Sequence, residues 1–172
     1  FVGRITLQKG PDYFIQLAQR VLELEPKTYF VVAGSGDMEV QIIREAARLG
    51  IAERVIFAGF LRGAELEAMY RAADIYILPS VSEPFGITPL ESLVAGTPVL
   101  ISKQSGVAEV VKHALKVDFW DVEEMTNQVV TVLRHPPFQQ TLATYGQHEV
   151  RKVTWLEAAK KCLGIYDGLV GT

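Results

Sequence analysis

Apolar residues along this chain fall into short continuous runs that alternate with longer stretches of helical periodicity. The runs are rich in Val, Ile, Phe and Tyr and predict strands at residues 1–4, 29–33, 55–58, 75–78, 98–102 and 115–119. Between them, apolar positions recur at helical spacing and predict helices that include residues 14–22, 40–47, 66–70 and 88–95. Strand and helix therefore alternate along most of the chain.

This alternation indicates the fold class. Strands that read as continuous apolar runs are typical of a parallel sheet buried on both faces, so we predict a Rossmann-like α/β fold. Beyond position 121 the pattern is only helical, at residues 122–134, after Pro136-Pro137, and at 155–169. The 172 residues show no repeats or linkers and are expected to form a single domain, 1–172. Residues 1–4 resemble the end of a strand whose start lies upstream, as in a piece cut at a domain boundary.

The stretch S-E-P-F-G-I-T-P-L-E at residues 82–91 follows the strand at 75–78. Thr88 suits an N-cap, Pro89 suits the first helical position, and Glu91 would complete a capping box. Gly96 is placed to end the helix. A buried strand should therefore lead into a loop that opens a helix.

The start of this helix is a candidate anion site. The amides of Gly86, Ile87 and Thr88 would be unpaired donors at a positive dipole end, which suits a phosphate group. Arg4 and Lys9 follow the first strand and share the carboxyl edge of the sheet, where ligands bind in open α/β folds. Together these groups predict a clamp for a diphosphate that could stabilise the charge on a leaving nucleoside diphosphate.

Composition and the remaining motifs exclude several classes. A net charge of -3 offers no footprint for nucleic acid, and no apolar run approaches a membrane span of about 20 residues. Gly34-Ser35-Gly36 lacks the third glycine of a dinucleotide fingerprint, Gly3 to Lys9 is not a Walker A loop, and three irregularly spaced histidines do not form a zinc motif. A lone Cys162 and no signal peptide lead us to expect a cytoplasmic protein.

Glu83 and Glu91, separated by the seven residues P-F-G-I-T-P-L, resemble the signature of retaining glycosyltransferases of family 4. These belong to the GT-B group, which includes bacterial starch and glycogen synthases. The segment G-R-I-T-L-Q-K-G at residues 3–10 is similar to the family's donor-diphosphate segment. The segment S-G-V-A-E at 105–109 is similar to its later glycine loop, with Ser105 in place of the first of two glycines. The resemblance covers nearly the whole chain but only the C-terminal, donor-binding half of the family.

The resemblance implies a role for each matching residue. Glu83 would lie against the donor sugar and, with Arg4 and Lys9, would form the catalytic set, while Glu91 would contact the donor ribose. Glu91 could instead serve only the helix cap, and Phe60 could lie near the nucleotide base or in the core. The full set implied to bind substrate is Gly3, Phe60, Phe85, Gly86, Ile87, Thr88, Glu91, Ser105 and Gly106.

The function implied is transfer of a hexose, expected to be glucose, from a nucleoside diphosphate sugar to a carbohydrate acceptor. No metal or cofactor is expected, and the acceptor would bind through an N-terminal domain outside this chain, so we expect this chain alone to be inactive. Three alternatives stay open: another GT-B sugar-nucleotide enzyme such as an epimerase or phosphorylase, a glycoside hydrolase using both carboxylates, and a non-catalytic carbohydrate- or nucleotide-binding module. The base, sugar and acceptor are left open by the sequence.

Overall fold

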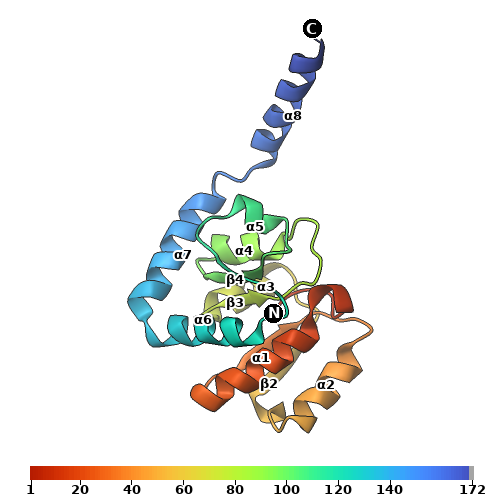
Figure 1. Ribbon diagram of the computed structural model, residues 1–172, viewed down its shortest axis with the longest axis vertical. Coiled ribbons are helices and arrows are strands. Elements are labelled where there is room, and N and C mark those ends of the chain that lie inside the picture. Colours follow the sequence, from red (N-terminus) through yellow and green to blue (C-terminus); the bar gives the residue numbers. More distant parts are fainter. Residues whose placement is uncertain (171–172) are drawn as a thin grey trace.

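The computed structural model describes residues 1–170 and consists of parallel strands interleaved with helices (Figure 1). The strands are β1 (Phe30–Ala33), β2 (Val55–Gly59), β3 (Tyr76–Leu78), β4 (Val99–Ser102) and β5 (Leu115–Val117). The α-helices are α1 (Pro11–Leu24), α2 (Glu39–Arg48), α3 (Gly63–Ala72), α4 (Thr88–Val94), α5 (Val107–Val110), α6 (Val122–Arg134), α7 (Pro136–Val150) and α8 (Trp155–Val170). Two 3-10 turns, η1 (Leu7–Lys9) and η2 (Ala52–Arg54), complete the order.

The strands form two parallel sheets rather than one. One sheet pairs β1 with β2, and the other has the order β3-β4-β5, with Tyr76 opposite Val99 and Leu100 opposite Leu115. The predicted α/β class with parallel strands is confirmed. The strand expected at residues 1–4 is not formed; that segment makes only an isolated bridge between Val2 and Ala33, so it does not join the two sheets.

The core lies between the sheets and their covering helices. All residues of β3 and β4 are buried, as continuous apolar runs predicted. The edge strand β2 differs, because Ile56 is half exposed where no further strand covers it. Helix α1 turns its apolar stripe inward, burying Phe14, Ile15, Leu17, Ala18 and Val21.

The C-terminal part is helical, which confirms the three helices predicted there. Asp121 caps α6 by accepting a hydrogen bond from the Glu124 amide at 3.0 Å, and Arg134 at its other end contacts the Glu25 carboxylate at 2.5 Å. Helix α8 extends away from the rest of the domain (Figure 1), with residues 155–169 exposed. Among the helices described here, none is both long and apolar enough to cross a membrane.

Candidate functional site

The loop before α1 is pressed against the end of β3. Gly10 has a φ of +65°, and a Cβ there would lie 2.1 Å from the Pro79 carbonyl oxygen, so glycine is required. The carbonyl of Gln8 accepts hydrogen bonds from the amides of Val81 at 3.0 Å and Ser82 at 3.4 Å. Lys9 is therefore held between two residues that are anchored to the segment after β3.

This anchoring brings Lys9 to Glu83. The Lys9 ammonium forms an ion pair with the Glu83 carboxylate across 74 residues of sequence. The pair is largely shielded, because 16% of the Lys9 side chain and 9% of the Glu83 side chain are exposed. The Lys9 stem passes Gly3, where a Cβ would lie 3.9 Å from three of its side-chain carbons. Gly3, Lys9 and Glu83 thus meet at one place, as the sequence predicted for a shared sheet edge.

The loop after β4 completes this place through its backbone. Ser105 forms a parallel bridge with Glu83, and the amide of Gly106 donates to the Glu83 carbonyl at 2.9 Å. A Cβ on Gly106 would lie 2.2 Å from the Pro84 carbonyl oxygen, so this approach requires glycine. The main chain at Glu83 and Pro84 is therefore held in place by the main chain at Ser105 and Gly106.

The side chain of Ser105 is buried. Its side chain is 2% exposed, and its hydroxyl lies 3.3 Å from that of Ser102, which donates to the Ser80 carbonyl at 2.6 Å. The hydroxyls of residues 102 and 105 therefore join the ends of β3 and β4 from the inside. Ser105 therefore contacts Glu83 through its main chain.

The predicted capping box is wrong. Helix α4 begins at Thr88, so Ile87 occupies the N-cap position and no side chain caps it; the Glu91 amide donates to the Ile87 carbonyl at 3.0 Å. The Thr88 hydroxyl instead lies 2.8 Å from the Tyr76 hydroxyl. Because Tyr76 donates its proton to the Val2 carbonyl at 3.1 Å, Thr88 is the donor in this contact.

The Glu91 side chain is held by the neighbouring helix α3 and not by the first turn of its own helix, α4. Its Oε2 accepts a hydrogen bond from the Tyr70 hydroxyl of α3 at 3.1 Å, and the residue is exposed. Burial raises the pKa of the Tyr70 hydroxyl far above its usual value, so Tyr70 remains a donor at any physiological pH. Sequence reasoning missed Tyr70 and Tyr76 because aromatic residues within apolar runs look like core.

The first amides of α4 lie ahead of the helix's first internal hydrogen bond, as expected for residues 86–88. Gly86 has a φ of +96° and is buried against Glu83, where a Cβ would lie 3.1 Å from the Glu83 Cγ. Phe85 and Ile87 on either side are exposed, at 36% and 56%. The loop therefore buries its glycine against the carboxylate and turns its two large apolar side chains outward.

Two further residues predicted to contact the donor, Arg4 and Phe60, are exposed to solvent. Arg4 is exposed, and its guanidinium lies 3.5 Å from the Gln8 Oε1. Phe60 follows the last residue of β2 and is 73% exposed, so the core interpretation of Phe60 is wrong. Its predicted place near a nucleotide base stays a prediction.

The structure also explains the Gly34-Ser35-Gly36 stretch, which lacks the third glycine of a dinucleotide fingerprint. A Cβ on Gly34 would lie 1.9 Å from the Gly3 carbonyl oxygen, and one on Gly36 would lie 2.2 Å from the Ile5 carbonyl oxygen. These glycines let the segment from Gly3 to Ile5 pass directly over the end of β1, where the Gly3 amide donates to the Ala33 carbonyl at 3.0 Å. They shape the path of the loop that carries Lys9.

Comparison with known proteins matches residues 1–149 to the family described as glycosyl transferases group 1. The chain belongs to this family. An uncharacterized glycosyltransferase of Methanocaldococcus jannaschii is 35% identical over 171 residues, covering 96% of this chain and 43% of that relative. The chain thus spans less than half the length of that curated relative.

Solved structures agree with this group 1 assignment at the level of the fold. The C-terminal domain of a group 1 glycosyl transferase from Francisella tularensis superposes with a TM-score of 0.80 at 23% identity, covering 89% of this chain and 83% of that one. An Anabaena protein solved in complex with UDP-glucose gives a TM-score of 0.79 at 22% identity, covering 99% of this chain and 48% of that one. The predicted fold, the C-terminal half of a GT-B enzyme, is confirmed.

For this group 1 domain we expect the exposed Glu91 to contact a nucleotide and the buried Tyr70 to hold its carboxylate in place. Glu91→Gln should lower the melting temperature by no more than about 2 °C, because the Gln amide oxygen can still accept the hydrogen bond from Tyr70, and should weaken nucleotide binding roughly tenfold. Tyr70→Phe should weaken nucleotide binding less, since it removes only the support of the carboxylate. Thermal melts and calorimetry on the 172-residue chain measure both quantities. Unchanged nucleotide affinity in Glu91→Gln would exclude Glu91 from the binding site.

Proposed function

We propose that this chain is the donor-binding half of a retaining glycosyltransferase that moves a hexose, with glucose as the first choice, from a nucleoside diphosphate sugar to a carbohydrate acceptor. Membership of the group 1 family supports transfer of a sugar. The UDP-glucose bound by the Anabaena protein of the same fold supports the choice of donor class. The acceptor would bind to parts of the protein outside these residues.

The observation that carries the proposal is the meeting of Lys9 with Glu83. The Lys9 ammonium, from the segment at residues 3–10, contacts the Glu83 carboxylate, from the segment at residues 82–91. Both lie at the carboxyl edge of the strands, and Glu83 is on the loop that leads to the first amides of α4. A sugar diphosphate has the two groups that this place would bind: a dianionic leaving group and a ring rich in hydroxyls. We therefore assign the phosphates to the Lys9 side and the sugar ring to the Glu83 side.

Lys9 can serve both parts of such a donor. An ammonium has three N–H donors, so Lys9 can keep one on the Glu83 carboxylate while it turns another toward a phosphate oxygen. When the bond between the sugar and the diphosphate breaks, negative charge grows on that oxygen, and a fixed cation stabilises it. The exposed Arg4 guanidinium is free to turn from Gln8 to the same diphosphate, where it could bind two oxygens at once.

Glu83 would act on the sugar. Its burial and its hydrogen-bonded main chain hold the carboxylate in one position, so it can orient the ring and stabilise positive charge that develops at the anomeric carbon. Retention of configuration is part of the proposal and follows from the family resemblance. Product stereochemistry by NMR tests it.

Binding of UDP, ADP and GDP to the 172-residue chain tests the donor half directly. We expect one of them to bind, and Arg4→Ala to weaken that binding roughly ten- to a hundredfold, because a charge-assisted hydrogen bond contributes about 1.5–3 kcal/mol. The control is Arg44→Ala, which removes an exposed arginine of α2. If no nucleoside diphosphate binds, or if both variants bind equally well, the clamp is wrong.

The activity itself is tested in the longer protein, with and without an oligosaccharide acceptor. We expect nucleoside diphosphate release to depend on the acceptor and to be lost in Glu83→Ala, while the 172-residue chain alone shows no useful transfer. Release of free sugar in place of a glycosylated acceptor would favour the hydrolase alternative. Tight nucleotide binding without turnover for any donor would favour a binding module.

A further inference from the structure

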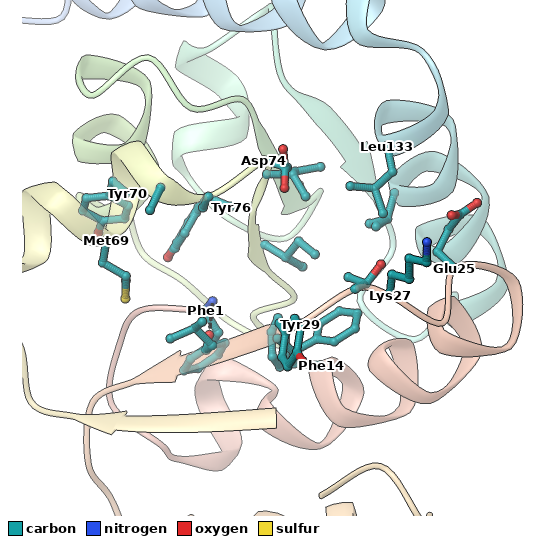
Figure 2. Close-up of a pocket in the computed structure, with 18 residues that line it drawn as sticks. Phe1, Phe14, Glu25, Lys27, Tyr29, Met69, Tyr70, Asp74, Tyr76 and Leu133 are labelled. Carbon is teal, nitrogen blue, oxygen red and sulfur yellow. Dashed lines mark hydrogen bonds between the residues drawn. The ribbon is translucent and has the colours of Figure 1, made fainter. Parts of the chain in front are cut away.

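One buried hydroxyl lies between the two segments to which we assign the diphosphate, residues 3–10 and the start of α4. It belongs to Tyr76, the first residue of β3, which is 2% exposed. The Tyr76 side chain runs from β3 toward the segment at Phe1, with the Tyr70 ring beside it (Figure 2). The two rings meet edge to face, with centroids 5.6 Å apart. The surroundings therefore hold this hydroxyl in one position.

On one side the Tyr76 hydroxyl fixes the start of the segment at residues 3–10. It donates to the Val2 carbonyl at 3.1 Å. The Gly3 amide belongs to the same planar peptide group and donates to the Ala33 carbonyl at 3.0 Å, so the Val2 carbonyl points the opposite way, toward β3. The chain that leads to Lys9 is therefore tied to β1 by one peptide atom and to β3 by another.

On the other side the same hydroxyl fixes the start of α4. It accepts a hydrogen bond from the Thr88 hydroxyl at 2.8 Å. Thr88 is the first residue of α4, and the amides at residues 86–88 lie ahead of the first hydrogen bond within that helix. Burial raises the pKa of the Tyr76 hydroxyl above its usual range, so the hydroxyl keeps the proton that it donates to Val2. One oxygen atom therefore acts as donor to one segment and acceptor from the other.

This hydroxyl is not needed to fill space. A phenylalanine at position 76 would keep the edge contact with the Tyr70 ring. It would leave the Val2 carbonyl and the Thr88 hydroxyl without their shared partner, and a buried polar group that loses its partner weakens the structure around it. The hydroxyl therefore acts on how the two segments are held, and removal of a single oxygen atom isolates its effect.

We propose that Tyr76 is a positioning residue for the donor. Its hydroxyl holds the segment at residues 3–10 and the start of α4 at the spacing that lets both bind one diphosphate. Tyr76 does not touch the donor itself, because its hydroxyl is buried and both of its hydrogen bonds are made to the protein. This inference rests on the proposed function, which assigns the diphosphate to these two segments.

The coupling is tested first without ligand, by amide hydrogen exchange in the 172-residue chain. Tyr76→Phe removes both hydrogen bonds, so exchange should become at least about threefold faster at Gly3 and at Glu91. Thr88→Val removes only the bond on the α4 side, so exchange should quicken at Glu91 and stay within about twofold of the unmodified chain at Gly3. If Tyr76→Phe leaves exchange at Gly3 unchanged, the hydroxyl does not hold that segment and the proposal is wrong.

The effect on the donor is measured by calorimetry with UDP, ADP and GDP. Tyr76→Phe should weaken the binding of whichever nucleotide binds by about three- to tenfold, because the two segments no longer hold their spacing. The control is Ser92→Ala, which removes a buried hydroxyl of α4 that donates to the Thr97 carbonyl at 3.2 Å and contacts neither segment. It should leave nucleotide affinity within about twofold and exchange at Gly3 as in the unmodified chain. Equal losses of affinity in both variants would show that Tyr76 acts only through stability.

A double variant completes the test. Tyr76→Phe combined with Thr88→Val should bind nucleotide no more weakly than Tyr76→Phe alone, because both substitutions break the same contact; additive losses would overturn the proposal. The two measurements also separate this inference from the proposed function. If exchange changes as expected but no nucleoside diphosphate binds to the unmodified chain, the proposed function is wrong and the positioning role is lost with it. If nucleotide binds equally well to Tyr76→Phe and the unmodified chain, the proposed function stands and the positioning role is wrong.

Discussion

Replacing Lys9 with methionine should lower the free energy of unfolding by about 3 kcal/mol, the lower end of the range for breaking a buried ion pair. Methionine keeps most of the stem that packs along Gly3 but leaves the Glu83 carboxylate, 9% exposed, without its cation. Nucleotide affinity should fall in the same variant. Urea denaturation and calorimetry give the two quantities.

A second substitution separates the two roles of Lys9. In Lys9→Met combined with Glu83→Gln, the unpaired charge is gone, so most of the lost stability should return while nucleotide affinity stays low. The control is Lys103→Met, which breaks a more exposed pair with Asp118 at 2.8 Å and should lower stability far less than Lys9→Met, because solvent screens exposed ion pairs. A double variant as unstable as Lys9→Met alone would show that the ion pair is not the cause.

Gly34→Ala should be among the most destabilising single methyl additions in the chain, at about 3 kcal/mol or more. Gly34 has a φ of +140°, and the new Cβ would lie 1.9 Å from the Gly3 carbonyl oxygen, so the loop that leads to Lys9 must move. We expect donor affinity to fall as well, although residue 34 is not assigned to the donor.

The matched control for this prediction is Gly50→Ala. Gly50 also has a positive φ, +73°, but its Cβ would meet nothing within 4 Å, so only the backbone cost of about 1–2 kcal/mol applies. The difference between the two variants measures the clash. If both lose the same stability and bind nucleotide equally, the close approach at Gly3 has no effect on the site.

Much of the fold could be predicted because local patterns decide it. Buried parallel strands need uninterrupted apolar residues, and helices with one buried face need the helical spacing seen around Phe14 and Met125, so both kinds of element were visible in the sequence. The number of sheets was not visible. Two sheets form because β1 and β3 do not pair with each other, and the pairing of strands from different parts of the chain is a tertiary property.

The parts of the site that are formed by residues close together in the sequence could be predicted. The contacts made by residues from other helices and strands could not. The loop from Glu83 to Thr88 and the cation at Lys9 were read correctly as parts of one sheet edge. The helix cap was predicted wrongly because side chains from other elements bind the two expected capping residues. The Thr88 hydroxyl contacts Tyr76 of β3, and the Glu91 carboxylate accepts a hydrogen bond from Tyr70 of α3. Local capping rules cannot account for partners that arrive through folding.

The bridge between Glu83 and Ser105 bears on how sequence variation in this loop should be interpreted. Position 105 contributes main chain to the site and points its side chain inward, so serine there keeps the geometry that a glycine would give. Position 106 has no such freedom, because the Pro84 carbonyl occupies the space of a Cβ. A motif search that demands glycine at both positions would reject chains like this one, whereas a search that fixes glycine only at 106 would retain them.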